Sequence, residues 1–511
     1  MPASPRLPTR SIRGLMSSSS GFIDKHGLWT EDQRARSKEV TDRIAKDGVK
    51  LVRVAWSDPH GVSRAKTVTS EVFRGAMTNG YNINVATATL DASGARVFSS
   101  FTRGGGLGLE EMTGSPNLII VPDPFTFRVL PWEPTVGWVL CDDYFTSGRP
   151  FHFSPRHVLR KQVERLSGRG LRSVVGLEVE WYLLRLADDR LTEQNLGAPG
   201  IKGRALRAYP VEPGYSFHSE TSFDLMHEPI ARLASAYEAL DLPVRSFENE
   251  WGPGQVECTF GPADALRAAD NLLLFRTATR QIMRRMGYLA SFMCRPKVKG
   301  LYSSGWHLHQ SLVDSAGANA FTPSESGIPL SSLGMSYLGG LLAHGIPATV
   351  FANPTVNAYR RFRANSLAPD RLAWGNDHRG VMLRILGEPG DPASRIENRL
   401  GEPSANPYLY VASQIITGLD GIDNSLDPGA PDTDPYSTDR TRLPKSLPLA
   451  LDSLSQSALF RREMGDLFVN YYLALKRKEA DRFAEFVAAN SLDPSSDEIT
   501  DWEQNEYFDF F

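Results

Sequence analysis

Residues 174–183 of the chain are Val-Val-Gly-Leu-Glu-Val-Glu-Trp-Tyr-Leu, an apolar run interrupted by two carboxylates, Glu178 and Glu180. The run is short and rich in β-branched and aromatic residues, which predicts a buried β-strand. Because side chains alternate between the faces of a strand, Glu178 and Glu180 point the same way, roughly 6–7 Å apart. Two buried acids at this spacing repel each other and lose hydration, so the pair needs a cation nearby. A solvent-facing pair of acids, or acids paired with arginines, is the simpler alternative.

The composition of the 511 residues is that of an ordinary globular protein, with 41% hydrophobic and 23% charged residues. The formal net charge of −3 gives no reason to expect nucleic acid or an anionic membrane as a partner. Three widely spaced cysteines, without a C-x-x-C pair, argue against a disulfide framework or a zinc knuckle. We therefore expect a reducing, cytoplasmic location.

The chain is long enough for more than one domain. Residues 1–30 are expected to form a disordered tail, because the first twenty are rich in Ser, Pro and Arg. A small domain is expected over 31–150, with a helix over 30–47 and a half-buried strand over 49–56. The larger domain is expected over 151–511, with helices near 155–166, 227–240, 263–286 and 455–489. The long uncharged stretch 326–359 is broken by prolines, which favours a buried helix and turns over a membrane span.

Two further groups of polar residues could join the first pair. In Glu248-Asn-Glu250-Trp-Gly-Pro-Gly-Gln-Val-Glu257, a Gly-Pro-Gly turn separates Glu250 from a strand that carries Glu257. This segment alone could equally be a hairpin with exposed acids. In Ser303-Ser-Gly-Trp-His307-Leu-His309, two histidines at strand spacing follow a turn. A single histidine is more often structural, but this pair favours a site.

Arginine dominates the region between residues 360 and 399, which contains no lysine. Its last part, Arg395-Ile-Glu397-Asn-Arg399, places an acid and two arginines on one face. The guanidinium fork matches carboxylate and phosphate oxygens, so this bias indicates anionic ligands.

Together these segments supply five carboxylates and one histidine beside clustered arginines. Such a donor set suits Mg²⁺ or Mn²⁺ rather than zinc. Two such ions with arginines are a recurring arrangement for transferring a phosphoryl group from ATP. The chain has no Walker A motif and no G-x-G-x-x-G motif. The residues therefore predict a two-metal, ATP-using enzyme that is neither a P-loop enzyme nor a typical kinase.

These segments, in this order, resemble the glutamine synthetase family from about residue 49 to the C-terminus. The most specific matches are Gly176-Leu-Glu-Val-Glu180, Gly254-Gln-Val-Glu257, Gly305-Trp-His-Leu-His309, Asn353-Pro-Thr-Val-Asn-Ala-Tyr-Arg-Arg361 and Arg395-Ile-Glu-Asn-Arg399. The resemblance implies an α+β fold, with a small N-terminal β-grasp domain and a larger catalytic α/β domain built on a curved antiparallel sheet. It also implies a homo-oligomer of stacked rings, commonly a dodecamer, whose active sites are shared between subunits.

The resemblance further implies roles for the matching residues. Three acids would hold one metal ion: Glu180, Glu250 and Glu257. Two acids and a histidine would hold a second ion, at the phosphates of the co-substrate ATP: Glu178, His307 and Glu397. Two or three Mg²⁺ or Mn²⁺ ions are implied per site. Three polar residues would lie near ATP: His309, Ser311 and Arg395. Arg379 and Arg384 would contact the transferring phosphate, and Arg361 and Arg399 the carboxylates of glutamate.

Four positions depart from the ammonia-using members of the family. A flap glutamate is replaced by Leu367, and an aspartate from the neighbouring subunit by Asn84. Both lost carboxylates would bind ammonium and remove its proton. Trp306 stands where a methionine is usual, and Tyr302-Ser303 replaces an Asn-Gly pair that contacts the amino acid. We expect Leu367 and Trp306 to give the amine pocket apolar bulk.

The sequence therefore predicts an ATP-dependent ligase that joins the γ-carboxylate of glutamate to an organic amine, an alkylamine or arylamine, through a γ-glutamyl phosphate. A polyamine would need acids at the missing positions. Three alternatives remain open: an ammonia-dependent glutamine synthetase, a catalytically silent structural relative, and a carboxylate kinase that forms no amide.

Overall fold

The computed structural model describes residues 20–188, 190–363, 366–436, 439–493 and 496–511. Of the predicted disordered tail, residues 1–19 lie outside the described residues. Residues 20–30 differ from the prediction: they include helix α1 (Phe22–Lys25), and the side chains of Ile23 and Trp29 are buried. The indole Nε1 of Trp29 donates a hydrogen bond to the carbonyl of Pro122 at 3.0 Å. Apolar burial holds this segment against the first domain.

The N-terminal residues form a mixed sheet with strand order β2-β1-β6-β4-β3, and β5 pairs with β6. The strands are β1 (Leu51–Ser57), β2 (Ser63–Thr69), β3 (Tyr81–Asn84), β4 (Asn117–Pro122), β5 (Arg128–Val129) and β6 (Val136–Tyr144). Strands β1 and β6 are parallel. The predicted first helix is α2 (Glu31–Lys46). Thr30 and Gln33 cap its N-terminus with a reciprocal capping box. Helix α3 (Ser70–Asn79) follows β2.

The larger sheet has the order β13-β14-β15-β12-β7-β10-β9, with β8 and β11 also paired to β7. Its central strand, β7 (Arg172–Leu186), contains the predicted strand over 174–183 and extends it at both ends. The others are β8 (Ala208–Pro210), β9 (Val244–Asn249), β10 (Gln255–Phe260), β11 (Tyr288–Ser291), β12 (Trp306–Val313), β13 (Trp374–Asn376), β14 (Leu383–Leu386) and β15 (Arg395–Gly401). The strand pairs of this sheet are antiparallel, except for the parallel pair β13–β14.

One face of β7 belongs to the core, where Leu177, Val179 and Trp181 are buried. Glu178 and Glu180 occupy the alternate positions, as the strand period requires. The helices that follow the first domain are α4 (Pro155–Ser167), α5 (Glu220–Asp224), α6 (His227–Ala239), α7 (Ala265–Arg285), α8 (Ser332–Ala343), α9 (Gly345–Ala352), α10 (Pro407–Asp423), α11 (Leu447–Gln456), α12 (Ala458–Met464), α13 (Asp466–Ala489) and α14 (Asp501–Tyr507). Of these, α4 and α7 pack against β7. The architecture agrees with the predicted α+β fold. None of the described helices has the length and apolar character needed to cross a membrane.

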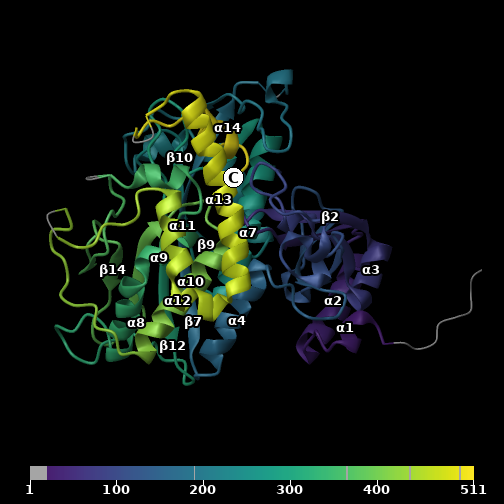
Figure 1. Ribbon diagram of the computed structural model, residues 1–511, viewed down its shortest axis with the longest axis horizontal. Coiled ribbons are helices and arrows are strands. Elements are labelled where there is room, and N and C mark those ends of the chain that lie inside the picture. Colours follow the sequence, from purple (N-terminus) through teal and green to yellow (C-terminus); the bar gives the residue numbers. More distant parts are fainter. Residues whose placement is uncertain (1–19, 189, 364–365, 437–438, 494–495) are drawn as a thin grey trace, which may run out of the picture.

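The small sheet and the large domain lie side by side, with α4 and α7 near the junction (Figure 1). A buried charge cluster joins them. The guanidinium of Arg156 at the start of α4 contacts Asp123 and Asp142 of the first domain at 2.8 and 2.7 Å. It also contacts Asp270 of α7 at 2.7 Å. One side chain therefore neutralises acids from both domains.

Candidate active site

The first contacts of the site join β7 to β12. The antiparallel register places His307 opposite Glu178. The Nδ1 atom of His307 lies 2.5 Å from Oε1 of Glu178 and 3.7 Å from Oε1 of Glu397. Its Nε2 atom lies 4.0 Å from Oε1 of Glu180. One imidazole therefore stands among three of the predicted metal-binding carboxylates.

Strand β10 adds Glu257, which is paired with Glu180 across the β7–β10 ladder. Glu178, Glu257 and His307 each offer a ligand atom, and these atoms lie within 4.8 Å of one another. The amide of Gln255, which shares a face of β10 with Glu257, donates to Oε2 of Glu180 at 2.7 Å. This bond fixes the orientation of the Glu180 carboxylate.

A second group of ligand atoms within 4.8 Å consists of Glu178, His309 and Glu397. The Nε2 atom of His309 lies 3.1 Å from Oε2 of Glu178. Gly176 is paired with His309, and a Cβ atom at position 176 would lie 3.3 Å from that of His309. The absence of a side chain at Gly176 therefore leaves room for the second imidazole.

The carboxylates repel one another strongly. Burial, together with Glu178 and Glu180, raises the pKa of Glu257 to about 11. Burial and Glu250 raise the pKa of Glu180 to about 8. Burial works against ionisation of Glu178 as well, but His307 and His309 hold its pKa below the usual range. The cluster has more acids than its own cations neutralise, and a divalent ion would relieve the excess. Oxygen ligands with imidazole fit Mg²⁺ or Mn²⁺.

The predicted division of the ligands into two metal sites stays a prediction. Glu257 lies close to Glu178 and His307, but it is also paired with Glu180, and both Glu180 and Glu250 raise its pKa. Glu250 belongs to a third, more exposed group with Glu248 and His218. Glu248 could have been found, because it precedes Glu250 by two residues, at the end of a strand. His218 lies in a loop, where no pattern in the sequence marks it.

Four of the predicted arginines lie at the cluster. Arg384 and Arg399 contact the two oxygens of Glu397 at 2.9 and 2.5 Å. Arg361 donates to the carbonyls of Leu400 and Gly401 at 2.7 and 2.5 Å. A Cβ atom at Gly305 would lie 2.9 Å from Nη2 of Arg361 and 3.3 Å from Oε1 of Glu180, so the guanidinium and this carboxylate lie on either side of Gly305. The fourth, Arg395, lies beside His309, while Arg379 is exposed.

The residues predicted to lie near ATP share one cavity. His309, Ser311 and Arg395 line a cavity of about 470 Å³, together with Glu178 and Arg245. The Nε atom of Arg395 and Nδ1 of His309 are 3.2 Å apart. The cavity thus opens beside Glu178, with cationic groups on its wall.

The expectation that Trp306 gives the amine pocket apolar bulk is wrong. Its side chain is fully buried and packs edge-on against Tyr410, with ring centroids 4.8 Å apart. The guanidinium of Arg276 lies over the indole at 5.7 Å. Since His307 faces the carboxylates, its neighbour on β12 must face the opposite side of the sheet. Trp306 is therefore a core residue and does not line the site.

The three other departing residues lie outside the metal-ligand groups. Leu367 has φ +63° and a 61% exposed side chain. Asn84 is exposed at the end of β3, where its Oδ1 accepts from the backbone N–H of Ala86 at 2.7 Å. Tyr302 is half-buried, and its backbone exchanges two hydrogen bonds with the hydroxyl of Tyr182.

Exposed aromatic side chains lie at the edge of the carboxylate cluster, and the sequence pattern did not reveal them. Tyr215 and Trp251 meet edge-on with centroids 5.9 Å apart, and the Tyr215 N–H donates to the Trp251 carbonyl. The Trp251 N–H donates to a carboxylate oxygen of Glu250 at 3.2 Å. Phe217 stacks on His218 at 3.8 Å. We call Tyr215, Phe217 and Trp251 the aromatic rim.

Known proteins similar to this chain belong to the same class that its site residues indicate. Residues 152–494 match the family model of the glutamine synthetase catalytic domain. The chain is 43% identical over 499 residues to a γ-glutamylanilide synthase from Acinetobacter sp, covering 96% of this chain and 99% of the relative. It is 31% identical to a glutamate–isopropylamine ligase from Pseudomonas sp, covering 90% and 97% of the two chains.

Among solved structures, a GmaS/ADP complex superposes with a TM-score of 0.72 at 25% sequence identity, over 91% of this chain and 98% of that one. The catalytic-domain match spans more than half of the chain, and it includes the strands that carry the carboxylates and histidines. The protein belongs to the glutamine synthetase family.

Proposed function

We propose that this protein is an ATP-dependent ligase that joins the γ-carboxylate of glutamate to an organic amine through a γ-glutamyl phosphate. The observation that carries the proposal is the group formed by Glu178, Glu257 and His307 beside Arg361 and Arg399. Carboxylates and imidazole suit divalent cations, and arginines suit anionic substrates. The 43% identity to a γ-glutamylanilide synthase supports the same chemistry.

Each group has a role in this reaction. The acids and His307 would hold Mg²⁺ or Mn²⁺ ions, which when bound neutralise charge on the ATP phosphates. Arg361 and Arg399 would bind and orient the carboxylates of glutamate. Arg384, with the exposed Arg379, would neutralise charge on the transferred phosphoryl group. His309, Ser311 and Arg395 would line the ATP site, because all three face one cavity.

The nucleophile would be an amine that is neutral at working pH. Leu367 and Asn84 cannot take a proton from ammonium, whereas an arylamine needs no such help. The aromatic rim offers π-faces next to Glu250, and an aromatic amine would pack against them. Arylamines are therefore the favoured substrates, ahead of alkylamines and far ahead of polyamines.

The exposed position of Asn84 supports shared active sites, since a neighbouring subunit could supply it. We propose a homo-oligomer of stacked rings, commonly a dodecamer in this family, that acts in the cytoplasm. Native mass spectrometry would test the assembly, with even multiples of the 56.5 kDa chain expected.

The reaction is tested with purified protein, ATP, Mg²⁺, glutamate and a panel of aniline, isopropylamine, putrescine and ammonium. We expect phosphate release together with a γ-glutamyl amide detected by mass spectrometry, greatest with aniline. Strong turnover with ammonium would contradict the preference for organic amines. Phosphate without amide would indicate a carboxylate kinase, and the absence of metal-dependent phosphate release would indicate a silent relative.

The Leu367→Glu variant is the companion to this panel, and Leu367→Gln is its size-matched neutral control. Restoring a carboxylate should raise the use of ammonium relative to aniline, while the glutamine variant should not. Equal behaviour of the two variants would remove Leu367 from amine selection.

A further inference from the structure

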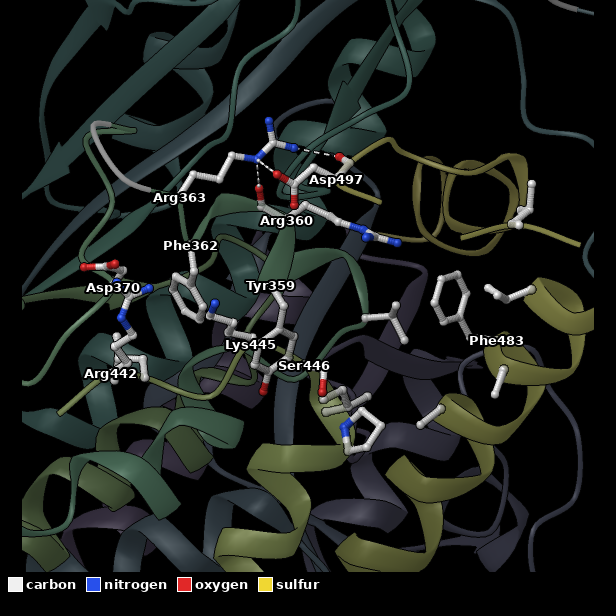
Figure 2. A pocket seen from close by; sticks show the side chains of 18 of the residues that line it. Tyr359, Arg360, Phe362, Arg363, Asp370, Arg442, Lys445, Ser446, Phe483 and Asp497 are labelled. Carbon is white, nitrogen blue, oxygen red and sulfur yellow. Dashed lines mark hydrogen bonds and ion pairs between the residues drawn. The ribbon is translucent and has the colours of Figure 1, made fainter. Parts of the chain in front are cut away.

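A cavity of about 1050 Å³ lies apart from the metal-ligand groups. It is formed by the short helical segment η6 (Asn357–Arg361), residues 442–448 and the C-terminal part of α13. Figure 2 shows Tyr359 and Phe362 on one side and Phe483 on another, with Lys445 and Ser446 on the intervening loop. Its volume is at the upper end of the range that small-molecule sites occupy.

The walls of this cavity differ in character. Apolar side chains from α13 and the adjoining loop form one part, including Leu447, Phe483 and Val487. The other part is cationic. The side chains of Arg442 and Lys445 form no ion pair or hydrogen bond with other residues that the structure describes. The acids that line the cavity already have partners, since Asp497 pairs with Arg363 and Asp370 with Arg371. The unmatched charge is therefore positive.

We propose that this cavity binds a small monocarboxylate with an aromatic or branched alkyl body. The carboxylate would lie at Arg442 and Lys445, and the apolar body would lie against Phe362 and Phe483. A charged group with an apolar body matches both kinds of wall.

The segment η6 connects the cavity with the active site. Tyr359 and Arg360 of η6 line it, while Arg361 of the same segment lies near enough to Glu180 to lower its pKa. A bound carboxylate would therefore change the KM for glutamate, a consequence that rests on the proposed function. Binding itself does not, because it can be measured without turnover.

Phenylacetate is a suitable probe, titrated into the full-length protein by calorimetry in the presence of saturating glutamate. Phenylacetamide has the same shape without the charge, and acetate has the charge without the apolar body. We expect phenylacetate to bind and both controls to bind at least about tenfold more weakly, since each lacks one of the two interactions. Failure of phenylacetate to bind, or its displacement by glutamate, would overturn the proposal.

One double variant and a matched control locate the probe. Replacing both cations (R442A/K445A) should weaken phenylacetate about tenfold or more. The matched control K38A/R74A, which removes two exposed cations from α2 and α3, should bind as the unaltered protein does. Equal binding by the two double variants would place the probe elsewhere and refute the site.

Discussion

Among single residues, Glu257 shows most directly why the site favours a divalent ion. Its carboxyl has a pKa raised to about 11 by burial and by neighbouring acids, so the free protein keeps it protonated at neutral pH. A glutamine at this position would reproduce that neutral form. A divalent ion, in contrast, requires the carboxylate and must displace the proton.

We therefore expect Glu257→Gln to leave the Tm of the metal-free protein unchanged or slightly higher. The increase in Tm on adding Mg²⁺ or Mn²⁺ should shrink, because losing a charged ligand costs about 1.5–3 kcal/mol. Thermal unfolding with and without each ion measures both effects. The exposed Glu238 of α6 provides a matched control as Glu238→Gln. An undiminished response to metal would remove Glu257 from the ligands.

The aromatic rim leads to a prediction about specificity. Trp251 follows Glu250 directly and pairs with Tyr215, so it can cover one face of an aromatic amine. We expect Trp251→Ala to lower kcat/KM for aniline about two- to tenfold, since an aromatic pair contributes about 0.5–1.5 kcal/mol. The value for isopropylamine should change less.

The control for Trp251 is Phe125→Ala, which removes an exposed aromatic residue from the N-terminal domain. It should leave both amines unaffected. An equal loss for aniline and isopropylamine in Trp251→Ala would mean that the indole supports the fold of the site rather than selecting the amine.

At the level of elements, the strand period explains both the success and the failure of sequence reasoning. It correctly placed Glu178 and Glu180 on one face of β7. The same period, applied to β12, would have placed Trp306 opposite His307 and thus in the core. The aromatic rim had no such signal, because a hydrogen bond between two distant loops joins Tyr215 to Trp251. Contacts of this kind depend on the folded chain.

Strand β6 carries a buried acid whose titration affects stability. Burial and the adjacent Asp142 raise the pKa of Asp143 to about 8, whereas an unfolded aspartate titrates near about 3.9. Between these values the folded chain keeps a proton that the unfolded chain has lost. The free energy of unfolding therefore falls as pH rises from about 4 to 8.

Asp143→Asn should remove this dependence. We expect the variant to be more stable than the unaltered protein by at least about 1 kcal/mol at pH 9, with a much smaller difference at pH 5. Urea unfolding at both pH values measures the change. Asp224→Asn, at an exposed acid on α5, should show no such difference. A pH-independent effect would mean that Asp143 titrates normally.

For the whole molecule, the sequence predicted two domains and the central strand, but it could not show how the domains are joined. The Arg156 cluster with Asp123, Asp142 and Asp270 depends on three separate segments meeting at one buried point. Since removing one partner from such a cluster leaves unpaired buried charges, the junction holds the N-terminal domain in a fixed position. Asn84 is presented from this domain, exposed at the end of β3.

The fixed position of Asn84 allows a test of whether the active site is shared between subunits. Asn84→Asp would keep the hydrogen bond to the Ala86 N–H and add a carboxylate. Leu367→Glu would add the other missing acid in the catalytic domain. If neighbouring subunits complete each site, co-expressing the two single variants would bring both acids together in roughly a quarter of the sites of a randomly mixed ring. We expect such mixed assemblies, purified through two different tags, to use ammonium faster than the mean of the two homogeneous variants. A rate equal to that mean would show that Asn84 and Leu367 do not meet across a subunit interface, because no chain in the mixture carries both substitutions.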